Sequence, residues 1–271
     1  MDLTDINVFE KDLRDGEVIV GIASSPEEKI GRMQVVTDRY MFQGYLQGIP
    51  FVKMDLDARD VVGEGGFSLL EEHLDPEKLE DFMKEGLLIS FMNEDPLYID
   101  KYHWQSVQFV GITNQGYVGS VRLIMSNPTS EVPTFKLPTL TDRKIKIEKE
   151  WKKAVKHIPA ELSQFAKLKS APGTVSVALL RAAAQYSRAN GIEEWVATTD
   201  NLVIRLLNGI YFNFGLPKIG PSVCYLGSES TPILINIEES LNNAEQKASS
   251  KDTAKFLKGE AVPGFEWYTG I

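Results

Sequence analysis

The strongest constraint on the fold lies between residues 159 and 215, where strand-like and helical patterns alternate. A run of strand formers over 161–169 is followed by helical spacing over 174–190, and a second strand pattern follows over 194–199. Two strands joined through one helix lie parallel in the same sheet, because the helix returns the chain to the edge where the first strand began. The sequence therefore predicts a β-α-β unit.

A long helix is predicted after a strand pattern at 17–22. Ser25 is placed as the N-cap residue, and Pro26 occupies the first helical position, where a missing N–H is tolerated. Glu28 completes a Ser-x-x-Glu capping box. Apolar residues then recur at three- and four-residue spacing to about residue 45, which predicts that one face of the helix is packed.

The remaining patterns complete the predicted architecture. An Asn-Gln-Gly turn at 114–116 joins two β-rich runs and predicts an antiparallel hairpin. Further helices are expected at 76–84, 142–157 and 201–214, and further strands at 223–226 and 233–237. We expect an α/β (α+β) fold, with a mixed central sheet flanked by helices. One domain is expected over 1–240, with an acidic insertion near 55–100 and a polar tail over 241–271.

Charge is distributed unevenly along the chain. The formal net charge of −9 disfavours nonspecific binding to nucleic acid, which depends on Lys and Arg neutralising phosphates. Residues 55–100 hold fourteen acidic and three basic side chains, whereas 141–157 hold seven Lys and Arg against three acidic ones. The basic segment, Arg143–Lys156, is either a solvated surface or a dock for an anionic partner.

Several classes of protein are not expected. A lone Cys224 excludes an intramolecular disulfide framework, and the acidic start Met1–Asp5 is unlike a signal peptide. No apolar run approaches the roughly 18 residues of a membrane helix. We therefore expect a cytoplasmic protein without a membrane span. The three histidines lack metal-binding spacing, so no metal site is expected.

Four short motifs carry a resemblance to a known family. Glu161-Leu162-Ser163-Gln164-Phe165-Ala166 is similar to a Glu-x-Ser-Arg-hydrophobic strand, with Gln164 in place of the Arg, and Val118–Leu123 is similar to a Gly-x-x-Arg-Leu strand. Tyr98–Asp100 precedes the hairpin, where an acidic residue is expected, and Arg39–Phe42 resembles an Arg-x-x-hydrophobic-Phe helix but is one residue short. These motifs resemble the acyl-homoserine-lactone (autoinducer) synthases and N-acyl amino acid synthases of the acyl-CoA N-acyltransferase superfamily.

The resemblance implies an N-acyltransferase that moves an acyl group from an acyl-carrier-protein or acyl-CoA thioester to the primary amine of an amino-acid-like acceptor. No tightly bound cofactor is expected, since acyl-CoA or acyl-phosphopantetheine is the donor substrate. The donor would meet two segments, a strand and the start of the following helix: Phe165, Ala166, Lys167 and Leu168, then Gly173, Thr174, Val175 and Ser176. The helix start favours an anion, because its N–H groups lack intrahelical partners.

Roles in the reaction follow from the same resemblance. Glu161 is the expected base, because a carboxyl group beside an apolar channel has a raised pKa. Ser163 would hold Glu161 or a polar group of the substrate, and Tyr211 would protonate the departing sulfur. The remaining expected contacts, those with the acceptor, are made by Asp100, Arg122 and Arg39.

Structural roles for these residues stay open: a surface ion pair for Glu161, a small strand residue for Ser163, core packing for Tyr211 and a salt bridge for Asp100 and Arg122. The proposed partners are an acyl carrier protein at Arg143–Lys156 and a small amine. Alternatives are a conventional acetyl-CoA-dependent N-acetyltransferase and a thioester- or lipid-binding module without activity.

Overall fold

The computed structural model describes residues 13–92, 94–126, 134–209 and 211–269. The acidic start of the chain, on which the signal-peptide expectation rests, lies outside these residues, as does part of the loop before residue 138. Within them, no helix combines the length and apolar character needed to cross a bilayer. The same residues contain no group of three His, Cys, Asp or Glu side chains arranged to hold a metal ion.

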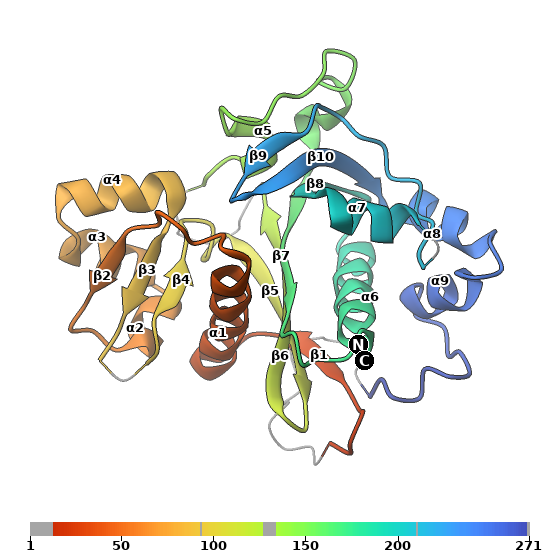
Figure 1. Cartoon of the computed structure of the whole chain (residues 1–271), viewed down its shortest axis with the longest axis horizontal. Helices are drawn as coiled ribbons and strands as arrows, with labels where there is room; N and C mark the ends of the chain where they lie inside the picture. The colour runs from red at the N-terminus through yellow and green to blue at the C-terminus, as the bar shows by residue number, and fades with distance from the viewer. Residues whose placement is uncertain (1–12, 93, 127–133, 210, 270–271) are drawn as a thin grey trace.

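A seven-stranded mixed sheet forms the centre of the molecule, in the order β1-β5-β6-β7-β8-β10-β9 (Figure 1). Its strands are β1 (Ile19–Ile22), β5 (Ser106–Thr113), β6 (Gly116–Met125), β7 (Ala160–Lys167), β8 (Glu194–Asp200), β9 (Val223–Tyr225) and β10 (Ser228–Asn236). Neighbours are antiparallel except β7 and β8, which are parallel and joined through α6 (Thr174–Ala189). The predicted mixed sheet, hairpin and β-α-β unit are confirmed.

Two long helices pack on the sheet, α1 (Pro26–Gln43) and α6 (Figure 1). The predicted capping box of α1 is present: Ser25 Oγ accepts from the Glu28 N–H at 3.2 Å, and Glu28 Oε2 accepts from the Ser25 N–H at 3.0 Å. On α6, Val175 packs where a Cβ on Gly119 would come within 2.4 Å of it. The missing side chain of Gly119 therefore lets α6 approach the sheet closely.

A smaller unit lies beside the central sheet, at the left of Figure 1. It contains a second sheet, in the order β2-β3-β4, and three short helices. Its elements are β2 (Phe51–Lys53), α2 (Ala58–Val62), α3 (Gly66–His73), α4 (Pro76–Glu85), β3 (Leu87–Ser90) and β4 (Leu97–Ile99). Val61, Leu70 and Phe82 lie in a second apolar cluster that also includes Ile30 and Met33 of α1. The acidic side chains of the unit are exposed or half-buried. The acidic stretch is thus an ordered α/β unit, and its treatment as an insertion in one domain stays a prediction.

The last part of the chain forms α8 (Ile237–Glu245) and α9 (Lys251–Leu257). Leu241 and Phe256 are buried in the largest apolar cluster, although the segment is polar overall. The Arg181 guanidinium of α6 lies 4.3 Å from the centre of the Phe256 ring. The Val18 N–H donates to the Trp267 carbonyl at 2.8 Å, so the segment also covers the edge of the sheet near β1.

The helix predicted over 142–157 is wrong. The structure has turns there, between the short helix α5 (Pro138–Thr141) and a single 3₁₀ turn at Ala154–His157. The Glu148 N–H donates to the Ile219 carbonyl at 2.9 Å, which ties the segment to the chain before β10. A helix would also place like-charged lysines four residues apart, where they repel.

The helix predicted over 201–214 is too long, because α7 spans only Asn201–Asn208. The Asn208 side chain accepts from the Leu216 N–H at 2.7 Å and donates to its carbonyl at 3.0 Å, which turns the chain back. A Cβ on Gly209 would lie 2.3 Å from the Arg205 carbonyl oxygen, so this close turn requires glycine. The other predicted elements are present, with boundaries shifted by a few residues.

Candidate functional site

A β-bulge in β7 sets the geometry of the site. Arg122 of β6 is opposite Ser163, and Ser120 is opposite Ala166, so β7 has one more residue than β6 between these pairs. Gln164 adopts a left-handed conformation there, with φ +48°. Strict alternation predicts Phe165 on the face of Glu161 and Ser163; that prediction is wrong, since the bulge puts Ala166 on this face instead.

The pairing between β7 and β8 ends before the bulge. Their parallel register covers Ala160 with Trp195 and Glu161 with Val196, while both strands continue further. On the other edge of β7, the Leu168 N–H donates to the Val118 carbonyl at 2.9 Å. Because backbone groups alternate between the two edges of a strand, the amide of Lys167, directly before Leu168, is directed to the edge facing β8.

Asp100 and Arg122 form a buried ion pair beside the bulge in β7, where Arg122 lies opposite Ser163. Arg122 Nη1 donates to Asp100 Oδ1 at 2.7 Å and Nη2 donates to Oδ2 at 2.6 Å, with the Arg122 side chain 3% exposed. Burial raises the pKa of Asp100, but the Arg122 charge and hydrogen bonds outweigh burial, so the pKa is lowered overall. Two sequence-predicted residues are thus brought together, and both Nη atoms of Arg122 are engaged by Asp100.

Glu161 lies on the same sheet face, opposite Ile124, and is 5% exposed. Its Oε2 accepts from the Thr139 N–H at 2.8 Å and its Oε1 accepts from Thr139 Oγ1 at 2.9 Å. Burial raises the pKa of Glu161 to about 8, although the Thr139 hydrogen bonds and the Arg122 charge act in the opposite direction. The raised pKa expected from the sequence is therefore present, in a group able to accept a proton near neutral pH.

Arg32 belongs to this cluster and was not predicted from the sequence. It is 1% exposed on α1, where Nη1 donates to Gln108 Oε1 at 3.1 Å and Nη2 donates to Gln164 Oε1. Gln164 Nε2 in turn donates to Asp100 Oδ2 at 3.4 Å. A signal was available, because Arg32 precedes Val36 by four residues and so lies on the buried stripe of the helix.

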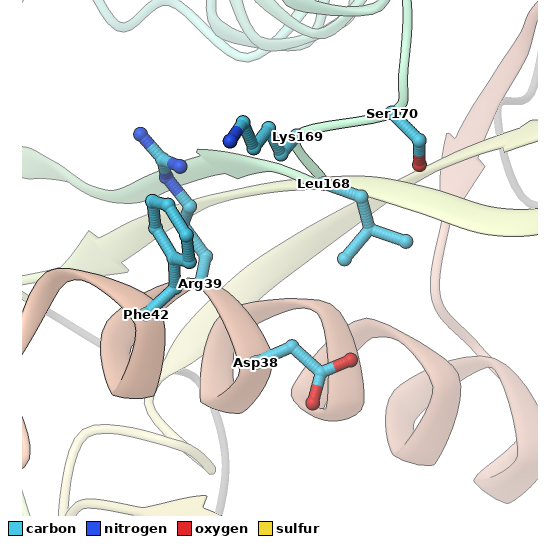
Figure 2. Close-up of a pocket in the computed structure, with 6 residues that line it drawn as sticks. All are labelled: Asp38, Arg39, Phe42, Leu168, Lys169 and Ser170. Atoms are coloured by element: carbon cyan, nitrogen blue, oxygen red, sulfur yellow. The ribbon is translucent and has the colours of Figure 1, made fainter.

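An open pocket of about 610 Å³ lies between the end of α1 and the segment after β7. It is lined by Asp38, Arg39, Phe42, Leu168, Lys169 and Ser170 (Figure 2). The Arg39 guanidinium and the Lys169 ammonium lie 5.4 and 5.2 Å from the centre of the Phe42 ring. Arg39 and Leu168, both predicted contact residues, thus meet in one cationic and aromatic pocket.

The other predicted donor-contacting residues occupy different surroundings. The Lys167 ammonium donates to the Ala171 carbonyl at 2.6 Å and closes the loop after β7. Val175 is fully buried in the main core, so its side chain faces the sheet. Gly173 is the N-cap residue of α6, directly before Thr174, and Ser176 lies in the first turn. Direct donor contact by these residues stays a prediction.

Tyr211 is not in a helix, contrary to the helix predicted over 201–214, because α7 ends at Asn208. It follows the end of α7, in a turn, and is 69% exposed. Glu161 is 5% exposed, so the two residues predicted as catalytic differ sharply in burial. The role of Tyr211 in protonating the leaving sulfur stays a prediction, without a buried site around the phenol.

Comparisons with known proteins give structural similarity only. No protein-family model matches the chain, and no curated protein matches it. Among solved structures, an N-acyl amino acid synthase from uncultured soil microbes is 14% identical with a TM-score of 0.49, over 83% of this chain and 94% of that one.

Two further structures represent acyl-homoserine lactone synthesis. The AHL synthase LasI is 15% identical with a TM-score of 0.46, over 90% of this chain and 96% of its own. The CoA-dependent acyl-homoserine lactone synthase BjaI, solved with SAM and isopentyl-CoA, is 11% identical with a TM-score of 0.46, over 94% of this chain and 93% of its own. At 11–15% identity, these similarities concern the fold alone.

Proposed function

We propose that the protein is an N-acyltransferase that moves an acyl group from a thioester to the primary amine of an amino-acid-like acceptor. The observation that carries the proposal is the position of Glu161. It is a buried carboxyl group with a pKa of about 8, placed where β7 and β8 stop pairing. Removal of a proton from an attacking amine needs a base of this kind.

Donor binding is supported by the edge of β7 that faces β8. The amide of Lys167 is directed to this edge, beyond the last pair between the strands. An extended chain with amide groups, such as a pantetheine arm, can add to such an edge through backbone hydrogen bonds. A backbone N–H there would also stabilise the oxyanion of the tetrahedral intermediate.

Acceptor binding is supported by the charged groups on the same face. Asp100 has a lowered pKa and stays ionised at neutral pH, so it can attract an ammonium group. Arg122 is engaged with Asp100 through both Nη atoms, so we assign it to holding Asp100 rather than to binding a free carboxylate. Arg39 is half-buried in the adjoining pocket and is the better candidate for an anionic group.

Two donors fit different parts of the surface. The Arg39–Lys169 pocket offers cations and an aromatic ring, which suit a phosphate-bearing nucleotide such as that of CoA. The seven basic side chains of Arg143–Lys156 are exposed and suit an acidic acyl carrier protein. We favour the carrier protein as donor, because Thr139, which binds Glu161, lies four residues before this basic segment begins.

The function is tested by supplying acyl-CoAs or acyl carrier proteins of several chain lengths with a mixture of amino acids. We expect N-acyl products by mass spectrometry, and we expect Glu161→Gln to lower the rate by about 10²-fold. Glu148→Gln, at an exposed carboxyl group, is the matched control. The proposal is wrong if no donor gives a product, or if Glu161→Gln turns over like the control.

The same assay identifies the donor. Lys149, Lys152 and Lys153 are exposed, and changing all three to Glu should slow transfer from the carrier protein while leaving transfer from CoA unchanged. The control variant carries the same change in net charge elsewhere on the protein, with Lys247, Lys251 and Lys255 all changed to Glu. Equal effects of the two triple variants would exclude docking at the basic segment.

A further inference from the structure

Glu161 is the first member of a chain of hydrogen bonds that ends on the neighbouring strand. Thr139 is fully buried and binds both carboxyl oxygens of Glu161, through its N–H and its hydroxyl. The Thr139 hydroxyl also lies 2.8 Å from the hydroxyl of Thr198. Thr198 belongs to β8 and is half-buried, two residues beyond the last pair between β7 and β8. These hydrogen bonds thus connect the buried carboxyl group of Glu161 on β7 with Thr198 on β8, across the gap where the two strands are no longer paired.

The direction of these hydrogen bonds depends on the charge of Glu161. Each threonine hydroxyl has one proton to donate. When Glu161 is ionised, the Thr139 hydroxyl donates to it, and Thr198 must donate to Thr139. When Glu161 is protonated it can donate to Thr139, and Thr139 is then free to donate to Thr198. When Thr198 gives its proton to an acceptor, Thr139 gives its proton to Thr198 and Glu161 gives its proton to Thr139, so one proton leaves Glu161 without movement of a heavy atom.

We propose that Thr139 and Thr198 form a proton relay that delivers the proton accepted by Glu161 to the departing thiolate. The inference rests on the proposed function. A neutral amine attacks the thioester carbon, the new C–N bond forms, and the amine nitrogen gives one proton to Glu161. The C–S bond breaks, Thr198 gives its proton to sulfur, and Thr139 and Glu161 replace that proton in turn. Glu161 returns to the carboxylate, and the products are an amide and a thiol.

The relay supplies an acid that is connected to the buried base, unlike the tyrosine expected from the sequence. Tyr211, predicted for this step, is 69% exposed in a turn after α7. Burial disfavours the ionised form of Glu161, so the protonated carboxyl group does not lose its proton readily. A hydrogen-bonded route is therefore needed to return Glu161 to the carboxylate. The two threonines give that route in the direction of β8, whereas the β6 side is occupied by the Asp100–Arg122 pair.

Other ionisable groups act on Glu161 from the elements around it. Arg122 on β6 lowers its pKa and Asp100, after β4, raises it. Tyr102 and Tyr225 interact with Glu161 electrostatically, and burial raises the pKa of both phenols well above the usual range. Both tyrosines are therefore neutral at the pH where Glu161 titrates, so the proton balance of the relay involves Glu161 alone.

The relay is tested by comparing two donors with different leaving groups, using hydroxylamine as the amine. Octanoyl-CoA releases a basic alkyl thiolate, whereas the octanoyl thioester of 5-thio-2-nitrobenzoate releases a weakly basic aryl thiolate that leaves without a proton. We expect Thr198→Val to slow transfer from octanoyl-CoA about 10²-fold and to leave transfer from the activated thioester unchanged. Thr198→Ser should restore the rate with octanoyl-CoA.

Thr199→Val is the control variant, since Thr199 is the next residue of β8 and points to the opposite face. It should change neither rate. Equal slowing of both donors by Thr198→Val would overturn the relay, because a merely structural defect does not depend on the leaving group. Full activity of Thr198→Val with octanoyl-CoA would overturn it as well.

A second measurement separates the relay from the proposed function. Failure of the wild-type protein with every donor would disprove the function, and infrared spectroscopy would then test the hydrogen-bond chain directly. The difference between wild type and Glu161→Gln identifies the C=O band of the protonated Glu161 carboxyl group. We expect Thr198→Val to shift this band and Thr199→Val to leave it in place. An unshifted band in Thr198→Val would overturn the relay regardless of activity.

Discussion

Two neighbouring regions of the site shift the pKa of a buried carboxyl group in opposite directions. In the Asp100 region, the Arg122 fork binds both carboxyl oxygens and lowers the pKa of Asp100. In the Glu161 region, neutral Thr139 binds both carboxyl oxygens, and burial raises the pKa of Glu161 to about 8. Both side chains are similarly enclosed, so the charge of the partner decides the protonation state.

The difference separates two tasks that one carboxyl group cannot perform at once. A permanently ionised Asp100 attracts a cation, whereas a Glu161 that titrates near neutrality accepts and releases a proton. Pairs of acidic groups with separated pKa values are a general arrangement of acid–base sites. The comparison predicts that loss of the Arg122 partner of Asp100 mainly affects folding, whereas changes in the Glu161 region mainly affect chemistry and pH dependence.

The largest effect on folding is expected for Arg122→Met. The change leaves the Asp100 carboxylate buried without its charged partner, which costs about 3–5 kcal/mol of the free energy of unfolding. Urea denaturation at pH 7 measures this loss. The double variant Asp100→Asn/Arg122→Met should recover part of the stability, because the unpaired charge is removed. A loss below about 1 kcal/mol in Arg122→Met would show that the pair is not enclosed as described.

An effect of intermediate size is expected for the pH dependence of stability in Glu161→Gln. The pKa of Glu161 is higher in the folded than in the unfolded protein, so its contribution to stability is complete below pH ~4.5 and is lost as the pH rises to about 8. Gln does not titrate. Between pH 5.5 and 8 the variant should therefore gain on the order of 3 kcal/mol relative to wild type.

The stability of Asp100→Asn should depend on pH differently from that of Glu161→Gln. The pKa of Asp100 is lowered by folding, so its contribution is present above pH ~3.8 and is lost as the pH falls through the folded pKa. The difference between this variant and wild type should be constant from pH 5.5 to 8 and should diminish in acid. Parallel profiles for the two variants, measured by urea denaturation at each pH, would contradict the separation of the two regions.

The smallest effect is expected for Ser163→Ala. Ser163 is half-buried and lies opposite Arg122, while both Glu161 oxygens are bound by Thr139. The free energy of unfolding should change by less than about 0.5 kcal/mol. The pKa of Glu161, followed by the infrared titration of its carboxyl band, should not move. A shift in that pKa would place Ser163 in the Glu161 region.

Local patterns predicted much of the fold because they act through neighbours in sequence. The capping box at Ser25 and Glu28, the hairpin turn and the alternation of helix and strand around α6 are of this kind. The two carboxyl groups of the site were also identified from short motifs. The basic segment was misassigned as a helix, since its backbone is held by the distant carbonyl of Ile219.

The parts of the site that were missed depend on contacts between distant residues. Arg32 meets Gln164 across 132 positions in sequence, and Thr139 meets Thr198 across 59. Neither pair has a local signature, because a lone Arg on a helix or a Thr in a loop is ordinarily solvated. The burial that makes these residues informative exists only after α1 and α5 pack on the sheet.

By itself, the sequence determined most strands and helices of the central fold and identified the Glu161 and Asp100 carboxyl groups, because periodicity, turn chemistry and short motifs are local. Tertiary structure alone decided how those groups are protonated. A bulge at Gln164 re-aimed the end of β7, packing excluded water from Asp100 and Glu161, and their different partners moved their pKa values apart. Desolvation and Coulomb interactions depend on distances in space, and these distances are set when remote segments pack together.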